Sequence, residues 1–306
     1  MPKITKSASI FNTRGILLEQ EPMWSHTSFS IGGNSDFFAV PSDLEDLRNL
    51  LLNARHANLG TFILGGGSNL LVADLGIRGL VIDMRNFDSF ESRRNTLILG
   101  SGLPVSDAAW RAGSAGMAGL DFLFGMPGTV GGALWMNARC YGAQISNFVD
   151  WVEVMDWEGR VGRMLVPGDE WGYKKSLFQR GDYIIIRAGF KIAQGDSETL
   201  KRSMLEKRED RLAKGHYRFP CAGSAFKNNR KFGAPSGVLI DRCGMKGYRV
   251  GGAAISAWHG NIVINDRGAA AADIETVLLA VARRVEAKIG VRLEREILFV
   301  GDWNNE

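Results

Sequence analysis

The run Gly65-Gly66-Gly67 constrains the fold most, because it separates two short apolar segments, TFIL (61–64) and LLVAD (70–74). Glycine has no Cβ atom, so a run of this kind lets backbone approach another group closely. The apolar residues on both sides favour a strand before the loop and a strand after it. The run therefore predicts a strand–loop–strand unit, in which the loop is either a tight turn or a backbone nest for an anion.

Two common nucleotide-binding motifs are excluded at this loop. A dinucleotide-binding turn has the pattern G-x-G-x-x-G at the start of a helix, but the last position of that frame is Leu70 and a strand follows. A P-loop requires Gly-Lys-Ser/Thr, which the segment lacks. What remains is a loop of bare glycine amides followed by the polar residues Ser68 and Asn69.

A second glycine-rich segment covers residues 125–142, with the sequence GMPGTVGGALWMNARCYG. Its glycines surround Pro127 and Thr129, and it ends in Asn137 and Gly142. Such a loop can lie flat along a large, rigid ligand, although the residues alone are equally consistent with a packing corner.

The rest of the chain alternates between predicted strands and helices, which indicates an α+β protein with more than one domain. Helices are predicted within 41–60, 197–215 and 273–290, with Gly215 and Gly290 ending the last two, and a final strand is predicted over 291–301. The helical period of the third helix places six apolar residues on one face: Ile274, Val277, Leu278, Val281, Val285 and Ile289. In the first, Ser42 precedes Glu45 by the spacing of a capping box, and Gly60 is expected to end the helix. Charged residues become frequent from Asp196 onward, which favours a domain boundary just before that residue.

Composition excludes several classes of protein. The net charge is +4 in 306 residues, but Lys and Arg are scattered, so we expect no nucleic-acid partner. The N-terminal stretch is polar and no apolar run approaches bilayer length, so we expect a soluble, cytoplasmic protein. No metal-binding spacing occurs among the four histidines or the three widely spaced cysteines, Cys140, Cys221 and Cys243.

Seven segments of the chain follow one another in a recognisable order: SFSIGGNSDFFAVP, LGGGSNLLVAD, GMPGTVGGALWMNARCYG, GYKKSLF, AGSAFKN, GYRVGGAAISAWHGNIVIN and LEREILFVG. In this order, and at about this spacing, they resemble the UDP-N-acetylenolpyruvoylglucosamine reductase (MurB) family, and the resemblance covers residues from about 21 to 301. The resemblance implies a bipartite FAD-binding unit of the vanillyl-alcohol-oxidase type and a C-terminal substrate-binding domain. The expected boundaries are 1–86 and 87–195 for the FAD-binding subdomains and 196–306 for the substrate domain, whose final strand returns to the active site.

The resemblance also implies the cofactor and the reaction. NADPH would give a hydride to FAD, which would pass it to the enolpyruvyl group of UDP-N-acetylglucosamine enolpyruvate, forming UDP-N-acetylmuramate for peptidoglycan synthesis. We expect a monomer that binds no metal. The residues expected to bind FAD are Gly65, Gly66, Gly67, Ser68, Asn69, Pro127, Gly128, Thr129, Gly131, Gly132, Asn137 and Gly142.

Hydride addition to the enolpyruvyl β-carbon leaves a carbanion beside a carboxylate, so the site needs a charge stabiliser and a proton donor. Ser224 in AGSAFKN matches the family's proton-donating serine, and Glu296 in LEREILF matches its catalytic glutamate. Glu294 is two residues from Glu296, so spacing along a strand cannot separate the two, and Glu296 is chosen by motif alignment.

Two positions depart from the family pattern. Lys174 stands where the family usually has a catalytic arginine, which keeps the charge but loses the bidentate fork. Leu298 stands where an arginine often follows the glutamate, so Arg249 is a candidate for the missing cation. The chain resembles the second type of the family, which lacks an extra substrate-capping loop. The residues expected to bind substrate are Tyr173, Lys214, Lys227, Asn228, Arg249 and His259.

Two alternatives to this function remain from the residues. One is another flavin oxidoreductase on the same fold. The other is an inactive sugar-nucleotide binding protein, which the change from arginine to Lys174 makes conceivable.

Overall fold

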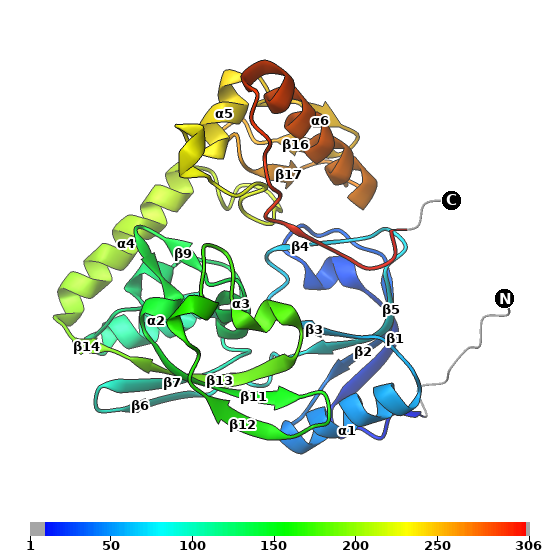
Figure 1. Ribbon diagram of the computed structural model, residues 1–306, viewed down its shortest axis with the longest axis vertical. Helices are drawn as coiled ribbons and strands as arrows, with labels where there is room; N and C mark the ends of the chain where they lie inside the picture. The colour runs from blue at the N-terminus through cyan, green and yellow to red at the C-terminus, as the bar shows by residue number, and fades with distance from the viewer. Residues whose placement is uncertain (1–9, 304–306) are drawn as a thin grey trace, which may run out of the picture. The chain divides into compact units, whose positions relative to one another are not determined.

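In the computed structural model, which describes residues 10–303, the chain passes more than once between two units (Figure 1). Unit 1 contains the described residues up to Glu21, together with Asp36–Gly66 and Gly79–Arg208. Unit 2 contains Pro22–Ser35, Gly67–Arg78 and the described residues from Glu209 onward. The boundaries proposed at 86/87 and 195/196 stay a prediction. The first nine residues of the polar N-terminal stretch, where we expect no targeting segment, lie outside the described residues.

Unit 1 contains a five-stranded antiparallel sheet in the order β12-β11-β13-β7-β6. Helices α2 (Val105–Ser114) and α3 (Val130–Trp135) pack on one face of it (Figure 1), where Leu99, Ala108 and Leu134 are buried in one core. The strands are β12 (Val161–Met164), β11 (Val149–Asp156), β13 (Tyr183–Lys191), β7 (Thr96–Gly100) and β6 (Phe90–Arg93).

A four-stranded sheet in the order β1-β2-β5-β3 supplies a second core in unit 1. Leu50 of helix α1 (Leu44–His56) and Ile82 pack there with Ile184 and Ile186 of β13. Ile185, between these two isoleucines, belongs to the first core. Strand β13 therefore contributes side chains to both cores, because successive side chains of a strand point to opposite faces. The strands are β1 (Ile16–Pro22), β2 (Asn34–Val40), β5 (Ile77–Asp83) and β3 (Thr61–Leu64).

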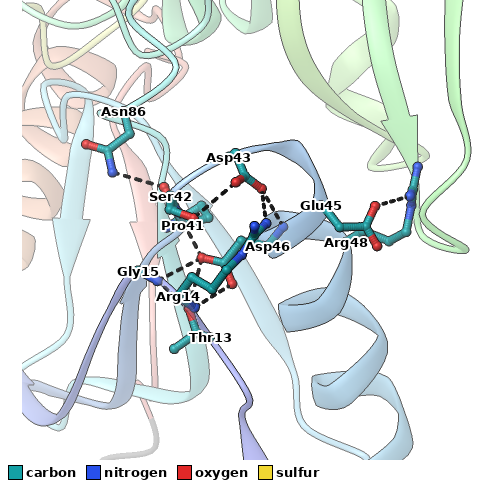
Figure 2. Close-up of polar contacts among 10 residues, drawn as sticks. All are labelled: Thr13, Arg14, Gly15, Pro41, Ser42, Asp43, Glu45, Asp46, Arg48 and Asn86. Carbon is teal, nitrogen blue, oxygen red and sulfur yellow. Dashed lines mark hydrogen bonds and ion pairs between the residues drawn. The ribbon is translucent and has the colours of Figure 1, made fainter.

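The structure shows a different N-cap for α1 from the one that the sequence predicts. Asp43, not Ser42, is the N-cap, and its carboxylate accepts a 3.0 Å hydrogen bond from the amide of Asp46 (Figure 2). The helix also ends at His56, before the predicted stop at Gly60. Ser42 instead donates its amide to the buried carboxylate of Asp46, at 2.8 Å. The predicted cap was wrong because the carboxylate of the next residue, Asp43, accepts the first-turn amide, whereas the hydroxyl of Ser42 donates to that carboxylate at 3.4 Å.

Asp46 ties this helix to the segment before β1. Its carboxylate accepts hydrogen bonds of 3.0 Å from the amides of Arg14 and Gly15 and from the hydroxyl of Thr13. Burial favours a raised pKa, but these bonds and the one from Ser42 outweigh it and hold the pKa of Asp46 below its usual value. Figure 2 shows the donors surrounding this carboxylate.

Unit 2 is built around helix α6 (Ala271–Ile289), whose predicted apolar face is buried from Ile274 to Val285. Ile289, placed on that face by the periodicity, is exposed, and Gly290 ends the helix with a φ of 77° as predicted. The helix packs with α5 (Ser236–Arg242) against an antiparallel sheet in the order β15-β16-β17. The strands are β15 (Arg249–Val250), β16 (Ala253–Ile255) and β17 (Val263–Asn265).

A parallel pair joins distant parts of unit 2. Strand β4 (Leu70–Val72) follows the glycine run and pairs with β18 (Leu298–Val300) (Figure 1). The last strand is therefore much shorter than the predicted 291–301. Just after β4, the Asp74 carboxylate accepts the first two amides of α6, from Ala271 at 2.8 Å and Ala272 at 3.1 Å. The aspartate of LGGGSNLLVAD thus caps a helix that lies far along the chain.

Helix α4 (Ser197–Ala213) is continuous, and Gly215, with a φ of 77°, follows it as the sequence predicts. In the described part of the chain, no helix has both the length and the apolar character that crossing a bilayer requires. The remaining elements are short: η2 (Met23–His26), β8 (Met117–Ala118), η3 (Asp121–Leu123), β9 (Arg139–Cys140), β10 (Ala143–Gln144), η4 (Ile145–Asn147), η5 (Gly168–Glu170), η6 (Leu177–Arg180), β14 (Ala193–Gln194) and η7 (Arg230–Phe232).

Candidate active site

The two glycine-rich loops contact each other within unit 1. A Cβ atom at Gly65 would lie 2.7 Å from Oγ1 of Thr129, and one at Gly66 would lie 2.6 Å from Cα of Gly128. Real Cβ atoms do not approach other atoms this closely. The first two glycines of the run are therefore required by close packing of one loop backbone on the other, which the sequence could not show.

The loop around Gly131 is held from its other side by residues that follow β7. The amide of Gly131 donates to the carbonyl of Ser101 at 2.8 Å, and a Cβ at Gly131 would lie 2.9 Å from that of Ser101. Gly132 differs, because it is exposed and its Cβ would meet only Thr129 Oγ1, at 3.7 Å. The missing side chain at Gly132 thus leaves room beside exposed backbone, as expected of a cradle that admits a flat cofactor.

The glycine run continues into unit 2, where it reaches Glu296. Gly67 has a φ of 59°, and a Cβ there would lie 2.0 Å from the carbonyl oxygen of His26. Two residues later, the Asn69 side chain donates to the Glu296 carbonyl at 3.2 Å, and the Asn69 carbonyl accepts from the amide of Leu298 at 3.0 Å. Ser68, between them, is half-buried. The end of the GGGSN segment therefore lies beside the backbone that carries the predicted catalytic glutamate.

Ser224 lies in a segment that is paired on both sides. On one side Ser224 forms a β-bridge with Ile262, and the amide of Ala225 donates to the carbonyl of Asn261 at 2.7 Å. On the other side the amide of Glu296 donates to the carbonyl of Ala225 at 2.8 Å. The structure thus brings the backbones of the predicted proton donor and the predicted catalytic glutamate together in unit 2.

The structure also separates Glu296 from Glu294. Glu296 is buried, with 7% of its surface exposed, whereas the side chain of Glu294 is 72% exposed. Glu294 forms an ion pair with Lys227, with Nζ 2.5 Å from Oε1. A buried carboxylate is uncommon and points to a special role, whereas an exposed ion pair is ordinary surface chemistry.

Tyr173 and Lys174 form the tip of a tight turn in unit 1. Gly172 and Lys175 exchange backbone hydrogen bonds of 3.0 and 3.2 Å on either side of them, and Lys174 adopts a left-handed φ of 57°. Asn137 is buried and donates its side-chain amide to the carbonyl of Gly172, at 2.8 Å. A strained backbone of this kind persists where surrounding contacts enforce it, often at functional sites.

The remaining predicted residues of unit 1 belong to the loop 127–142. Pro127 and Gly142 are both exposed, and Gly142 has a φ of 83° with nothing within 4 Å of a Cβ there. Their part in binding a cofactor stays a prediction.

A cationic region surrounds His259 in unit 2. Its imidazole lies 5.6 Å from that of His216, centroid to centroid, and its Nδ1 accepts a 3.1 Å hydrogen bond from the amide of Asn261. Burial, and then the charges of Lys214 and Lys246, lower the pKa of His259. Burial, and then the charges of Arg211, His259 and Lys214, lower the pKa of His216 to about 4. Both imidazoles are therefore held neutral at pH 7, with positive charge nearby.

The cations of this region also have acidic neighbours. Lys214 pairs with Asp210 at 2.6 Å and Lys246 with Asp241 at 2.8 Å, and the four side chains are 34% to 51% exposed to solvent. Exposed pairs of this kind are weak, so an anionic ligand can compete for the two lysines.

Two further predicted residues have contacts within unit 2. The Arg249 guanidinium forms hydrogen bonds of 2.6 and 2.8 Å with both carboxylate oxygens of Asp266, and this pairing raises the pKa of Arg249. The Asn228 side chain accepts the amide of Ser236 at 2.8 Å. Within residues 10–303, no three side chains of His, Cys, Asp or Glu form a group able to hold a metal ion.

Two residues near this site were missed in the sequence. Lys246 follows a glycine-rich turn and has no motif signature, so its proximity to His259 appears only in the fold. Asn261 was quoted inside a matching segment, but its contacts with the Ser224 segment are long-range. Nothing in the local pattern distinguishes it from a surface asparagine.

Comparison with known proteins agrees with the geometry. Residues 35–164 match the model of a family described as FAD binding domain, and residues 215–300 match that of UDP-N-acetylenolpyruvoylglucosamine reductase, C-terminal domain. The UDP-N-acetylenolpyruvoylglucosamine reductase of Heliobacterium modesticaldum is 41% identical over 94% of this chain and 92% of its own length. That of Treponema pallidum is 35% identical over 97% of both.

A solved structure extends the comparison to the fold. The UDP-N-acetylenolpyruvylglucosamine reductase (MurB) of Thermus caldophilus is similar, with a TM-score of 0.77 and 31% identity over 94% of this chain and 99% of that one. The fold and the two family matches define this chain as an α+β flavoprotein with an FAD-binding domain and a C-terminal domain, as the sequence predicts. The chain belongs to the UDP-N-acetylenolpyruvoylglucosamine reductase family.

Proposed function

We propose that the chain reduces UDP-N-acetylglucosamine enolpyruvate to UDP-N-acetylmuramate, with NADPH as the source of hydride. The observation that supports this most strongly is the pairing of the Ser224 segment with the Glu296 segment within residues 215–300, the part that matches the C-terminal domain of the family. This pairing holds a hydroxyl-bearing and a carboxyl-bearing residue in fixed register. A proton donor and a charge-stabilising group are what the reaction requires.

The proposed cofactor site is the backbone around Gly66 and Gly132. Both glycines are exposed, and the side chain missing at Gly132 leaves space next to the loop. FAD held there would supply the hydride chemistry, accepting hydride from NADPH and delivering it to the enolpyruvyl β-carbon. The role of the chain would be to hold the cofactor by glycine backbone, with Thr129 beside it in unit 1.

Ser224 is proposed to protonate the substrate carbon that becomes basic after hydride addition. An ordinary serine hydroxyl is a weak acid, but it can quench an enolate carbon when held within about 3 Å of it. Glu296, being buried, would act in a water-poor setting, where electrostatic effects on the substrate are strong.

The cations are proposed to bind the anionic groups of the substrate. Lys174, presented at the tip of its turn, would hold the substrate carboxylate. Lys214 and Lys246, beside neutral His259, would bind the diphosphate together with the imidazole N–H. In this arrangement His259 donates through Nε2, because its Nδ1 already accepts from Asn261.

The test is anaerobic flavin spectroscopy on the purified protein. We expect bound flavin, bleaching of its absorbance by NADPH, and rapid recovery of the absorbance on addition of UDP-N-acetylglucosamine enolpyruvate. A protein without bound flavin that fails to bind added FAD would indicate the inactive sugar-nucleotide binding protein. Recovery with oxygen but not with the enolpyruvyl substrate would indicate a different flavin oxidoreductase.

A further inference from the structure

The side chain of Asn261 pairs with the peptide backbone two residues after Ser224. Its Oδ1 accepts from the amide of Phe226 at 2.9 Å, and its Nδ2 donates to the carbonyl of Phe226 at 2.8 Å. Asn261 is 2% exposed and Phe226 is 3% exposed, so water does not compete for either bond. The amide thus satisfies both backbone groups of one residue, as a neighbouring strand would do.

The backbone of Asn261 adds to this contact. Its carbonyl accepts from the amide of Ala225 at 2.7 Å, and its own amide donates to Nδ1 of His259. The carbonyl of His259 in turn accepts from Ile262 at 3.0 Å, closing a turn around Asn261. The turn from His259 to Ile262 therefore holds Asn261 in place. Asn261 in turn forms hydrogen bonds with the backbone of Ala225 and Phe226.

We propose that Asn261 is a positioning residue that sets the place of the Ser224 hydroxyl through the backbone of residues 225 and 226. The inference rests on the proposed role of Ser224 as proton donor. Proton transfer to carbon requires close and aligned groups, and a misplacement of about 1 Å can cost about 100-fold in rate. Asn261 itself touches no reacting atom in this account.

Asn265 provides a matched control from the same segment. Asn265 is also buried, at 8% exposure, and its side chain also forms hydrogen bonds with backbone groups. It donates to the carbonyl of Phe29 at 3.0 Å and accepts from the amide of Ala269 at 2.8 Å. These contacts do not involve residues 224–226. Loss of either asparagine therefore removes similar bonds from unit 2, but only the loss of Asn261 is expected to move Ser224.

The experiment compares Asn261→Ala and Asn265→Ala as full-length holoenzymes, with the two half-reactions followed separately by stopped-flow absorbance. We expect Asn261→Ala to slow reoxidation of the NADPH-reduced protein by the enolpyruvyl substrate about 10- to 100-fold. Reduction by NADPH should stay within about 2-fold of wild type in both variants, and Asn265→Ala should also reoxidise at close to the wild-type rate.

A double-mutant cycle shows whether Asn261 acts through Ser224. In the Ser224→Ala background, Asn261→Ala should change the reoxidation rate by less than about 2-fold, because the group that it positions is gone. Equal effects of the two asparagine variants, or full additivity with Ser224→Ala, would overturn the proposal. If Asn261→Ala does not fold, Asn261→Asp, which keeps the acceptor for the Phe226 amide, serves in its place. If the wild-type protein itself is not reoxidised by the substrate, the proposed function has failed, a result distinct from either of these.

Discussion

The amide of Glu296 donates a 2.8 Å hydrogen bond to the carbonyl of Ala225, the residue that follows Ser224. Phe226 and Arg295 form a β-bridge next to this bond, and the amide of Lys227 donates to the carbonyl of Glu294 at 2.8 Å. The register between the two segments is thus fixed at several consecutive residues. This register makes Glu296 a buried residue and leaves Glu294 at the surface.

The two glutamates are therefore expected to behave differently when each is changed to glutamine. Glu296→Gln removes a buried charge from the proposed site, and we expect reoxidation of the reduced protein by the enolpyruvyl substrate to slow by about 100-fold or more. Glu294→Gln removes half of an exposed ion pair and should alter that rate by less than about 2-fold. Single-turnover absorbance measurements check both values. Equal slowing by the two variants would contradict the assignment of Glu296.

Alanine variants of Gly132 and Gly131 are expected to distinguish the effect of the loop glycines on cofactor binding from their effect on packing. Gly132→Ala adds a Cβ that clashes with no protein atom and improves helix propensity in α3, so the apoprotein should unfold at the wild-type temperature or higher. The same methyl group would fill the cradle, so FAD affinity should fall by about 10-fold or more, since close backbone approach is lost. Titration of apoprotein with FAD, followed by flavin fluorescence, gives this value.

Gly131→Ala is the matched variant, because its Cβ would lie 2.9 Å from that of Ser101. Here we expect a loss of stability of about 1–3 kcal/mol from overpacking, measured by urea unfolding of the apoprotein. If Gly132→Ala binds FAD as tightly as the wild type does, that result would contradict the proposed FAD site at the backbone of Gly132.

Asp46→Asn is expected to reduce the stability of unit 1. The asparagine side chain keeps one acceptor but places an NH2 group against donors, so we expect a loss of about 1–3 kcal/mol at pH 7. The pKa of Asp46 lies below its unfolded value in the folded protein, so the stabilisation is present above about pH 4 and is lost as pH falls through the folded pKa. Urea unfolding at pH 7 and below pH 4 should show the gap to wild type narrowing. A gap that is constant with pH would contradict this account.

His216 is expected to destabilise the fold as the solution becomes mildly acidic. Its pKa is about 4 in the folded protein, below the unfolded value of about 6.5. Between these values the unfolded chain binds more protons, so stability falls as pH falls through this window, by up to ~1.4 kcal/mol per pH unit. His216→Gln should remove this contribution, which unfolding midpoints at pH 7 and pH 5 will show. An unchanged slope in the variant would mean that His216 does not titrate as described.

Local patterns were sufficient for much of the fold. The strand–loop–strand unit around Gly65–Gly67 and the buried face of α6 up to Val285 follow from apolar periodicity, and the glycine that ends α6 follows from its freedom to adopt a left-handed φ. The cap of α1 was predicted one residue too early. Ser42 and Asp43 are both good caps, and only the hydrogen bond from the Asp46 amide to the Asp43 carboxylate shows which of them caps the helix.

The site depended on contacts that no local pattern records. Asn261 and Phe226 are 35 residues apart, and Asp74 caps a helix that begins 197 residues later. Glu294 and Glu296 could not be separated by spacing, since only pairing with the Ser224 segment shows which one is buried. The glycines at 65 and 66 predicted a close approach correctly, but the partner, the loop at Gly128 and Thr129, required the fold.

The proton-donor role of Ser224 is tested most directly by Ser224→Ala, with the two half-reactions measured anaerobically. The account predicts reduction by NADPH within about 2-fold of wild type and reoxidation by UDP-N-acetylglucosamine enolpyruvate slowed about 100- to 10,000-fold, the range for loss of a general acid. Equal slowing of both half-reactions, or a variant reoxidised at the wild-type rate, would contradict it.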